Sequence, residues 1–246
     1  MRIYNPRPIV LGFVFFIIVL LFSFYLLSKA LYQRYLMQMV WPLGAPSELS
    51  SSFQDSRKIN VLIVGDSRAK DWFLNDTNCF AIMNCAIAGS TTGQLKYLLP
   101  VLLDKHKPDI VIIQSGINDL KLLGLRPDLE SVINDGCFQN LREVVLYCIQ
   151  RNCKVFVTSI LPPNKPSFLR RFVWNKLIPE SVLEMNYRLA ALRYIDPRIH
   201  IVDLAMELHK SYNLQLNSDS YLDTLHLKPH INHKMSDVLS DIISKP

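Results

Sequence analysis

The stretch Asn60-Val-Leu-Ile-Val-Gly65-Asp66-Ser67-Arg68 decides the fold class of this 246-residue chain. Its first part is a short apolar run, rich in β-branched residues, that ends at a glycine. Such a run is typical of a buried parallel strand. In open α/β sheets, ligands bind beyond the carboxyl ends of the strands. Ser67 lies at this position, so the sequence marks it as a candidate nucleophile.

Strand and helix patterns alternate along the rest of the chain. We expect strands near 60–65, 80–85, 110–115, 154–160 and 199–202. We expect helices near 92–105, 128–152, 180–195 and 229–243, with a shorter helix after Ser67. This alternation predicts an α/β three-layer sandwich, in which helices cover both faces of a central parallel sheet of about five strands.

Three other segments carry groups that a nucleophilic serine needs. Asp223-Thr-Leu-His226 can supply an imidazole base and a carboxylate that orients it. Asn118 follows another apolar strand, and its side-chain N–H can donate to a developing oxyanion without changing the charge of the site. Gly89, within residues 84–90, would let a backbone N–H approach the same oxygen.

Four sequence blocks, taken in order, resemble those of the SGNH (GDSL-type) hydrolase family. They are Gly65-Asp66-Ser67, Gly89, Gly116-Ile117-Asn118-Asp119 and Asp223-Thr-Leu-His226. The resemblance covers roughly residues 58–244, which is nearly all of the chain after its N-terminal segment. It implies the flavodoxin-like SGNH fold and a serine hydrolase that acts on ester bonds.

The resemblance also implies a role for each residue of the site. Ser67 would attack an acyl carbonyl, His226 would act as general base and then general acid, and Asp223 would orient His226. The oxyanion hole would consist of the backbone N–H groups of Ser67 and Gly89 with the side-chain amide of Asn118. The family needs no metal and no other cofactor.

The motifs do not specify the acyl group or the alcohol. The expected reaction removes an acyl group, such as acetyl, from a cell-envelope glycan or from a lipid through an acyl-Ser67 intermediate. One alternative is an O-acyltransferase, in which a hydroxyl of an envelope polysaccharide takes the acyl group in place of water. The other is a non-catalytic, membrane-tethered binding protein.

The N-terminal segment has the length of a membrane span. Residues 9–27 contain no charged side chain, and as a helix they would extend roughly 28 Å, close to the hydrocarbon thickness of a bilayer. We expect an N-terminal transmembrane anchor (1–30), a juxtamembrane segment and tether (31–57) and a hydrolase domain (58–246). A cleaved signal peptide is the alternative, because Ser28-Lys29-Ala30 fits a small-x-small cleavage site. The apolar part of a signal peptide is usually about 7–15 residues, so the length favours an uncleaved anchor.

Charge suggests both an orientation and a class of partner. Arg2 and Arg7 precede the span, whereas Lys29 and Arg34 follow it. The short basic N-terminal arm favours the cytoplasm, which would place the catalytic domain on the periplasmic or extracellular side. The net charge of +6 favours anionic surfaces near the membrane. No Lys/Arg run alternates with aromatic residues, so we expect no nucleic-acid partner.

One long connection contains a local basic cluster. Residues 161–179 follow the fourth expected strand, at the end of the sheet where the site should lie, and long connections there are often binding loops. Within this connection, Arg170-Arg171 is flanked by Phe168, Leu169, Phe172 and Trp174. The cluster is either a lid that faces membrane or substrate, or a turn of an ordinary amphipathic helix.

Histidine and cysteine patterns do not favour a metal site. His226, His230 and His233 have a spacing that resembles zinc ligands. However, we expect Pro229 to start a helix, which leaves His226 in the preceding loop. The five cysteines include no Cys-x-x-Cys pair and favour neither a disulfide framework nor a zinc site. The alternative is a Cys79–Cys85 bridge, which an oxidising compartment would allow. We therefore expect no bound metal.

Overall fold

The computed structural model describes residues 7–40, 53, 57–74, 77–168, 170–172 and 174–244. The chain divides into two compact units, Met1–Leu43 and Gly44–Pro246. Residues 41–52 and 54–56, which the sequence analysis assigns to the tether, lie outside the described residues.

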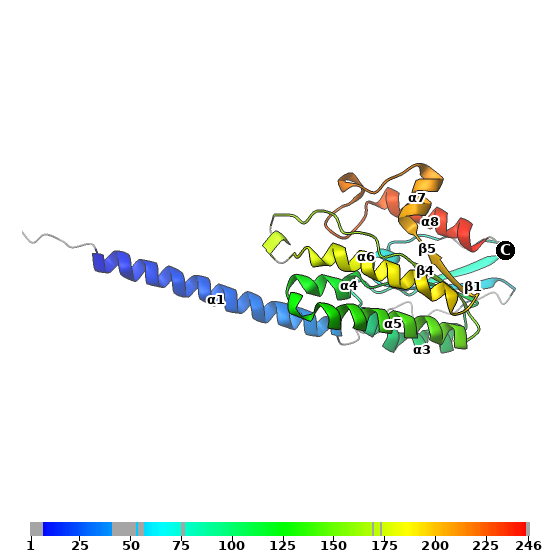
Figure 1. The fold of residues 1–246 in the computed structure, drawn as a ribbon, viewed down its shortest axis with the longest axis horizontal. Coiled ribbons are helices and arrows are strands. Elements are labelled where there is room, and N and C mark those ends of the chain that lie inside the picture. Colours follow the sequence, from blue (N-terminus) through cyan, green and yellow to red (C-terminus); the bar gives the residue numbers. More distant parts are fainter. Residues whose placement is uncertain are drawn as a thin grey trace, which may run out of the picture. The chain divides into compact units, whose positions relative to one another are not determined.

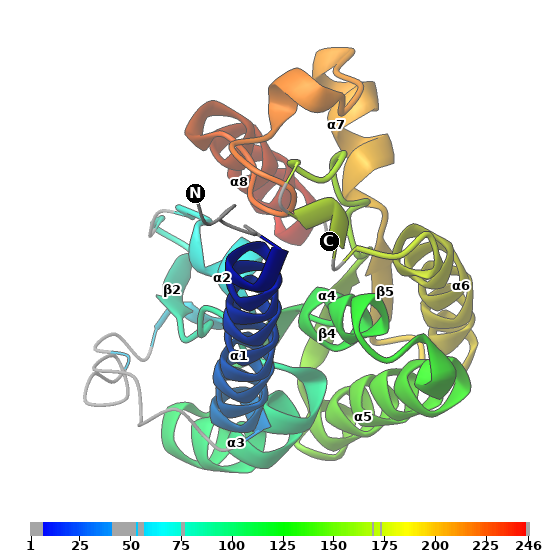
Figure 2. The same cartoon turned by 90° about the vertical axis from the view of Figure 1, so that its left-hand side faces the viewer.

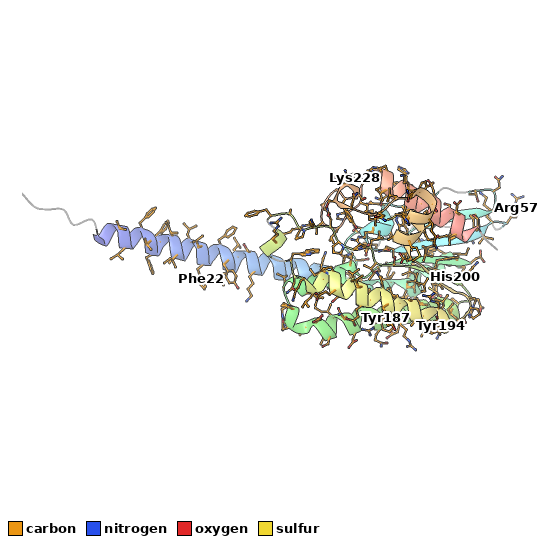
Figure 3. All side chains as sticks on the ribbon, turned by 45° about the horizontal axis from the view of Figure 1, so that its top comes forward. Phe22, Arg57, Tyr187, Tyr194, His200 and Lys228 are labelled. Atoms are coloured by element: carbon orange, nitrogen blue, oxygen red, sulfur yellow. The ribbon has the colours of Figure 1, made fainter. Side chains whose placement is uncertain are left out.

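The N-terminal unit contains helix α1, Arg7–Val40. From Val10 to Ala30 its mean hydropathy is 2.9, so this part is long and apolar enough to cross a membrane. Figure 3 shows its side chains, Phe22 among them, projecting outward around the helix. A signal sequence has the same properties, so both interpretations of this segment fit the helix. The helix also includes residues 31–40, which the sequence analysis places in the juxtamembrane segment.

The second unit is built on a parallel sheet of five strands (Figure 1). The strands are β1 Ile59–Gly65, β2 Phe80–Asn84, β3 Ile110–Gln114, β4 Lys154–Thr158 and β5 Ile199–Val202. Their order across the sheet is β2-β1-β3-β4-β5. All five predicted strands are confirmed, with small differences at their ends. Because β1 lies between β2 and β3, the loops that follow these three strands meet at one edge of the sheet.

Helices connect the strands. The α-helices of this unit are α2 Ser67–Lys70, α3 Thr92–His106, α4 Ile117–Leu120, α5 Glu130–Gln150, α6 Leu177–Ala190, α7 Leu204–Tyr212 and α8 Pro229–Ile243. The 3₁₀ helices are η2 Lys121–Gly124, η3 Pro127–Leu129, η4 Arg170–Phe172, η5 Ala191–Tyr194 and η6 Ser218–Ser220. The predicted helices are confirmed as α2, α3, α5, α6 and α8.

The side chains of the strands alternate between two separate cores. In β1, Leu62 and Val64 pack against α3, α5 and α6, whereas Val61 and Ile63 pack on the side of α2, α7 and α8. Figure 2 shows these two groups of helices on opposite faces of the sheet. All four side chains are fully buried, and each such burial contributes about 1.5–3 kcal/mol. The predicted three-layer α/β sandwich is therefore confirmed.

Helix α7 is an element that the sequence analysis did not predict. Asp203 caps its start by accepting a 3.2 Å hydrogen bond from the Met206 N–H, and Asn213 ends it with a left-handed φ of 50°. Leu204 and Leu208, four residues apart, are its buried side chains. These capping residues and this spacing are the signals from which the helix could have been predicted.

Candidate active site

Ser67 lies at the turn between β1 and α2. Gly65 ends the strand with φ +144°, and a Cβ there would lie 1.8 Å from the Gln114 carbonyl oxygen, so the turn requires glycine. Asp66 then caps α2, because its Oδ1 accepts a 2.9 Å hydrogen bond from the Arg68 N–H. As the first residue of α2, Ser67 has a backbone N–H with no acceptor inside the helix. Its hydroxyl and its N–H are therefore both placed at the carboxyl edge of the sheet.

A chain of hydrogen bonds joins Ser67 to two residues near the other end of the chain. The Nε2 atom of His226 lies 3.1 Å from the Ser67 Oγ, across 159 residues of sequence. The Nδ1 atom of the same ring lies 2.9 Å from the Asp223 Oδ2. A hydroxyl, an imidazole and a carboxylate in this order can make the hydroxyl nucleophilic, because the ring can take its proton while the carboxylate holds the ring.

The Asp223 carboxylate is held by its own loop. Its Oδ1 accepts hydrogen bonds of 2.6 Å from the Leu225 N–H and 2.8 Å from the His226 N–H. Partial burial would raise the pKa of Asp223, but these bonds and the bond to the His226 ring outweigh it and lower the pKa to about 2. The Leu222 N–H also donates to the His226 carbonyl at 2.8 Å, which closes the loop. Asp223 is therefore ionised and fixed in position at neutral pH.

Asn118 is held rigidly at the start of α4, directly after β3. Its side chain is buried, and its Nδ2 donates a 2.9 Å hydrogen bond to the Ser90 carbonyl. Its Oδ1 accepts a 2.8 Å hydrogen bond from the Lys121 Nζ. A primary amide carries two N–H groups, so one remains for another acceptor. The arrangement fixes which way the amide points and leaves it a donor.

The loop that carries Gly89 is bonded to the end of β1. The Gly65 carbonyl accepts two hydrogen bonds from it, at 2.9 Å from the Ile87 N–H and at 2.8 Å from the Ser90 Oγ. Gly89 has φ +80°, a backbone conformation that residues other than glycine rarely adopt. Through Ser90 this loop also contacts Asn118. The structure thus brings the Gly89 loop, the Ser67 turn and the Asn118 amide together.

Asp119 supports this side of the site, although the sequence analysis gave it no role. It is partly buried and accepts hydrogen bonds of 2.6 Å from the Thr92 Oγ1 and 2.9 Å from the Thr92 N–H. Burial raises the pKa of Asp119 to about 6, against the lowering effect of these bonds. The contact ties α4, which carries Asn118, to the first turn of α3. The signal in the sequence that could have indicated this role is the place of Asp119 in the block Gly116–Asp119.

The basic cluster of the long connection lies next to the candidate triad. Arg170, in η4, places its guanidinium 3.9 Å from the Asp223 Oδ2, and both side chains are about two-fifths exposed. Trp174 is partly buried and packs against the core beneath α5 and α6. Leu169 and the side chain of Phe172 lie outside the described residues. Arg170 therefore adds a cation to the rim of the candidate site, and the lid interpretation of the cluster stays a prediction.

The histidine spacing does not produce a metal site among the described residues, where no three His, Cys, Asp or Glu side chains are arranged to hold a metal ion. His226 is used by the candidate triad, as described above. His230 is exposed on α8, and the ring of His233 stacks on Phe73 at 5.4 Å. The five cysteines are all free thiols.

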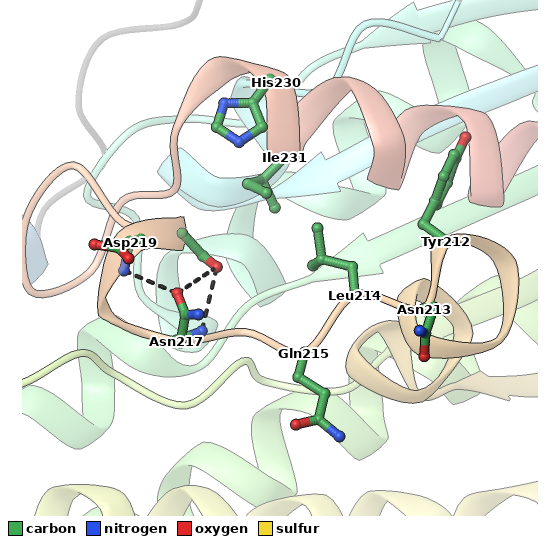
Figure 4. Close-up of a pocket in the computed structure, with 9 residues that line it drawn as sticks. Tyr212, Asn213, Leu214, Gln215, Asn217, Asp219, His230 and Ile231 are labelled. Atoms are coloured by element: carbon green, nitrogen blue, oxygen red, sulfur yellow. Dashed lines mark hydrogen bonds between the residues drawn. The ribbon is translucent and has the colours of Figure 1, made fainter.

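A separate cavity of about 600 Å³ opens between α7, η6 and α8 (Figure 4). It contains no residue of the candidate triad. The hydrogen bonds drawn there join Asn217 to Asp219 and Ser220, and they cap η6. Its lining comprises Tyr212, Asn213, Leu214, Gln215, Asn217, Asp219, Ser220, His230 and Ile231. These polar groups stabilise the segment before the Asp223–His226 loop.

Comparison with known proteins identifies the family. Residues 65–232, which include every candidate site residue, match the GDSL-like lipase/acylhydrolase family. The chain belongs to this family. It is also 33% identical over 132 residues to an arylesterase of Vibrio mimicus, a match that covers 47% of this chain. The same match spans 61% of the length of that relative.

Solved structures of other proteins share the fold. A GDSL-like lipase from Bacteroides thetaiotaomicron has a TM-score of 0.61 at 20% identity, over 86% of this chain and 96% of its own. An acetylxylan esterase from Geobacillus stearothermophilus, solved as a catalytic mutant, has a TM-score of 0.59 at 14% identity, over 79% of this chain and 98% of its own. At these identities the likeness shows a common architecture.

Proposed function

We propose that this GDSL-family chain is a serine esterase that hydrolyses an acyl ester through an acyl-Ser67 intermediate. The observation that carries the proposal is the continuous hydrogen-bonded series from Asp223 through His226 to Ser67. The family match, which includes all three residues, supports it. The arylesterase relative acts on esters according to its name and supports the same class of reaction.

In the proposed first step His226 takes the proton of the Ser67 hydroxyl as its Oγ attacks the acyl carbonyl. The ionised Asp223 stabilises the resulting imidazolium. The tetrahedral intermediate then collapses, the C–O bond to the alcohol breaks, and His226 gives its proton to the leaving alcohol oxygen. A water molecule, deprotonated by the same ring, attacks the acyl-enzyme and restores the Ser67 hydroxyl.

The oxyanion of each intermediate would be bound by three donors. These are the backbone N–H groups of Ser67 and Gly89 and the side-chain amide of Asn118. The Ser67 N–H has no helical acceptor, the Gly89 loop is bonded to the same turn, and the Asn118 amide is fixed by bonds at both ends. Donors that are already oriented need no reorganisation when the charge develops, which is why such groups lower the barrier.

We propose that the substrate is an acyl ester, such as an acetyl ester, on a cell-envelope glycan or lipid. The N-terminal helix is long and apolar enough to hold the enzyme at a membrane. The net charge of +6 and the rim cation Arg170 favour an anionic surface. Activity of the full-length chain on p-nitrophenyl esters of graded acyl length tests the proposal. Hydrolysis confined to short chains supports an acetyl ester, and no hydrolysis of any chain length contradicts the esterase.

Acyl transfer to a sugar hydroxyl is distinguished in the same assay. When a soluble oligosaccharide is added to the p-nitrophenyl ester, an esterase releases free carboxylic acid in an amount equal to the nitrophenol. A transferase releases less acid than nitrophenol, because the acylated sugar retains the difference. The expected result is equal amounts of the two products.

Replacing Asn118 by alanine is expected to lower kcat by about 10²–10³-fold, as is typical when one oxyanion donor is removed. The fold should be retained, because the lost bonds to Ser90 and Lys121 lie beyond the ends of the strands. Steady-state kinetics on a p-nitrophenyl ester measure the effect. Asn78→Ala, which removes an exposed amide just before β2, is the control. An unchanged kcat with a higher KM would mean that Asn118 contributes only uniform substrate binding.

The full-length protein is expected in membrane fractions and to resist extraction with salt and carbonate. A spanning helix is held far more firmly than a chain bound by surface charge. Protease added to spheroplasts should degrade the hydrolase domain and spare the N-terminus, since we propose that the domain lies outside the cytoplasm. Protection of the whole domain would indicate the opposite topology. A mature N-terminus at Leu31 would indicate a cleaved signal.

A further inference from the structure

Arg68, the residue after the candidate nucleophile, is a buried charge with contacts far from its own helix. Its side chain is 3% exposed. Its Nε donates a 3.0 Å hydrogen bond to the Leu225 carbonyl, and its Nη1 donates a 2.6 Å hydrogen bond to the Leu161 carbonyl. The two acceptors are 157 and 93 residues away in sequence. The guanidinium thus joins α2 to two separate loops.

The first of these acceptors belongs to the peptide bond that carries the candidate base. The Leu225 carbonyl and the His226 N–H are parts of one planar unit, so holding the carbonyl also holds the start of the His226 side chain. The guanidinium is planar, and its donors have fixed directions, unlike the flexible ammonium of lysine. Arg68 therefore fixes the position of the Asp223–His226 loop relative to Ser67, which is the residue before Arg68 in α2.

The second acceptor extends the same support. Leu161 begins the long connection after β4, and this connection is bonded to the loop at two more places. The Tyr221 hydroxyl donates a 2.6 Å hydrogen bond to the Pro162 carbonyl, and the Asn164 N–H donates a 2.8 Å bond to the Thr224 carbonyl. Arg68 closes this arrangement from the side of Ser67. Packing of Ala69 and Trp72 in the same core as Leu227 brings these segments together, and Arg68 adds the direct hydrogen bond to the loop beside Ser67.

Stability alone does not account for an arginine at this position. Its Nη2 is buried and has no hydrogen-bond partner among the described residues. Burial also lowers the pKa of Arg68, which shows that the site disfavours the charge even with Asp66 nearby. A buried charge with an idle donor is often replaceable by an apolar residue at no loss of stability. Local conflicts of this kind are expected where function requires the group.

We propose that Arg68 is a positioning residue, which holds the His226 Nε2 at hydrogen-bond distance from the Ser67 Oγ through the Leu225 carbonyl. The inference rests on the proposed triad. It assigns to Arg68 no contact with substrate. The loss of Arg68 should therefore slow the steps that need proton transfer between Ser67 and His226, while substrate binding stays nearly unchanged.

The test is a double-mutant cycle on the full-length protein with a p-nitrophenyl ester. Arg68→Met keeps an unbranched apolar stem and removes both bonds, and it is expected to lower kcat by about 10²-fold with little change in KM, since a displacement of about 1 Å can cost this much. In the His226→Ala background the same change is expected to cause no further loss, because there is no base left to position. Losses that multiply in the double variant would overturn the proposal.

Two other variants make the result specific. Arg68→Lys can keep one of the two bonds and is expected to lose less kcat than Arg68→Met; it replaces the methionine variant in the cycle if that chain does not fold. Arg142→Met makes the same chemical change at an exposed position on α5 and should leave kcat unchanged. A kcat equal to that of the unmodified enzyme in both Arg68 variants overturns the role of Arg68 alone. A Ser67→Ala enzyme that remains active overturns the triad on which it rests.

Discussion

Ser67→Ala is expected to lower kcat on the order of 10⁶-fold, the loss seen when the nucleophile of a Ser-His-Asp triad is removed. The reason is geometric, because the Ser67 Oγ is the atom 3.1 Å from the His226 Nε2. A fluorophosphonate probe, which reacts with activated serine hydroxyls, should label the unmodified protein at Ser67 and leave the variant unlabelled. Hydrolysis and labelling are measured on the same full-length preparation.

The matched control for this variant is Ser211→Ala. Ser211 is an exposed serine on α7, away from the triad loop, and its replacement should change neither hydrolysis nor labelling. Equal thermal midpoints for the three proteins would show that the fold is unaffected. Labelling or turnover that persists in Ser67→Ala contradicts the assignment of the nucleophile.

Asp223→Asn is expected to lower kcat by about 10⁴-fold, the loss known for the equivalent change in a serine protease triad. The Asp223 Oδ2 accepts a 2.9 Å hydrogen bond from the His226 Nδ1. This bond fixes the tautomer in which Nε2 can accept the Ser67 proton. An asparagine amide can donate to Nδ1 instead, which favours the wrong tautomer, and it cannot stabilise the imidazolium. The side chain keeps its size, so the loss should appear without unfolding.

The Asp223 carboxyl determines the pH range in which the unmodified enzyme should be compared with Asp223→Asn. Its pKa is lowered from 3.8 to about 2, so the carboxylate is present above roughly pH 4 and is lost only as the pH falls through about 2. Its contribution to stability follows the same window. Between pH 5 and pH 8, titration of Asp223 itself should therefore not alter the ratio of kcat between the unmodified enzyme and Asp223→Asn.

Asp219→Asn is the control for Asp223→Asn, because Asp219 is exposed on η6 in the segment before the triad loop and its replacement should leave kcat unchanged. An Asp223→Asn enzyme with nearly full activity would show that His226 is oriented by other contacts. The only role of Asp223 would then be to accept, at its Oδ1, the hydrogen bonds from the Leu225 and His226 N–H groups.

Local patterns predicted most of this fold because the sheet is parallel and buried on both faces. A strand such as β3 appears in the sequence as a continuous apolar run, and Gly116 follows two residues after its end. The same reasoning placed Ser67 and Asn118 at one edge, since strand ends in such a sheet share an edge. Helix α7 was missed because it is short and only two of its side chains, Leu204 and Leu208, are buried.

The contacts between distant segments could not be predicted in this way. Arg68 is next to Ser67 in sequence, yet its role depends on two carbonyl groups in loops whose paths are set by the whole fold. Arg170 was recognised as part of a basic cluster, but its distance to Asp223 follows from the course of the connection after β4. A backbone carbonyl that accepts such a bond cannot be recognised in a sequence, because every residue has a backbone carbonyl.

The order of the site along the chain has a consequence for biosynthesis. The candidate nucleophile follows β1, the first strand along the chain, and its proposed base is 159 residues later, just before α8. A nascent chain that has emerged only through β5 would already contain Ser67, Gly89 and Asn118, but nothing to deprotonate the serine. If the triad acts as proposed, the growing polypeptide has no esterase activity until the Asp223–His226 loop has been made and has packed beside Ser67.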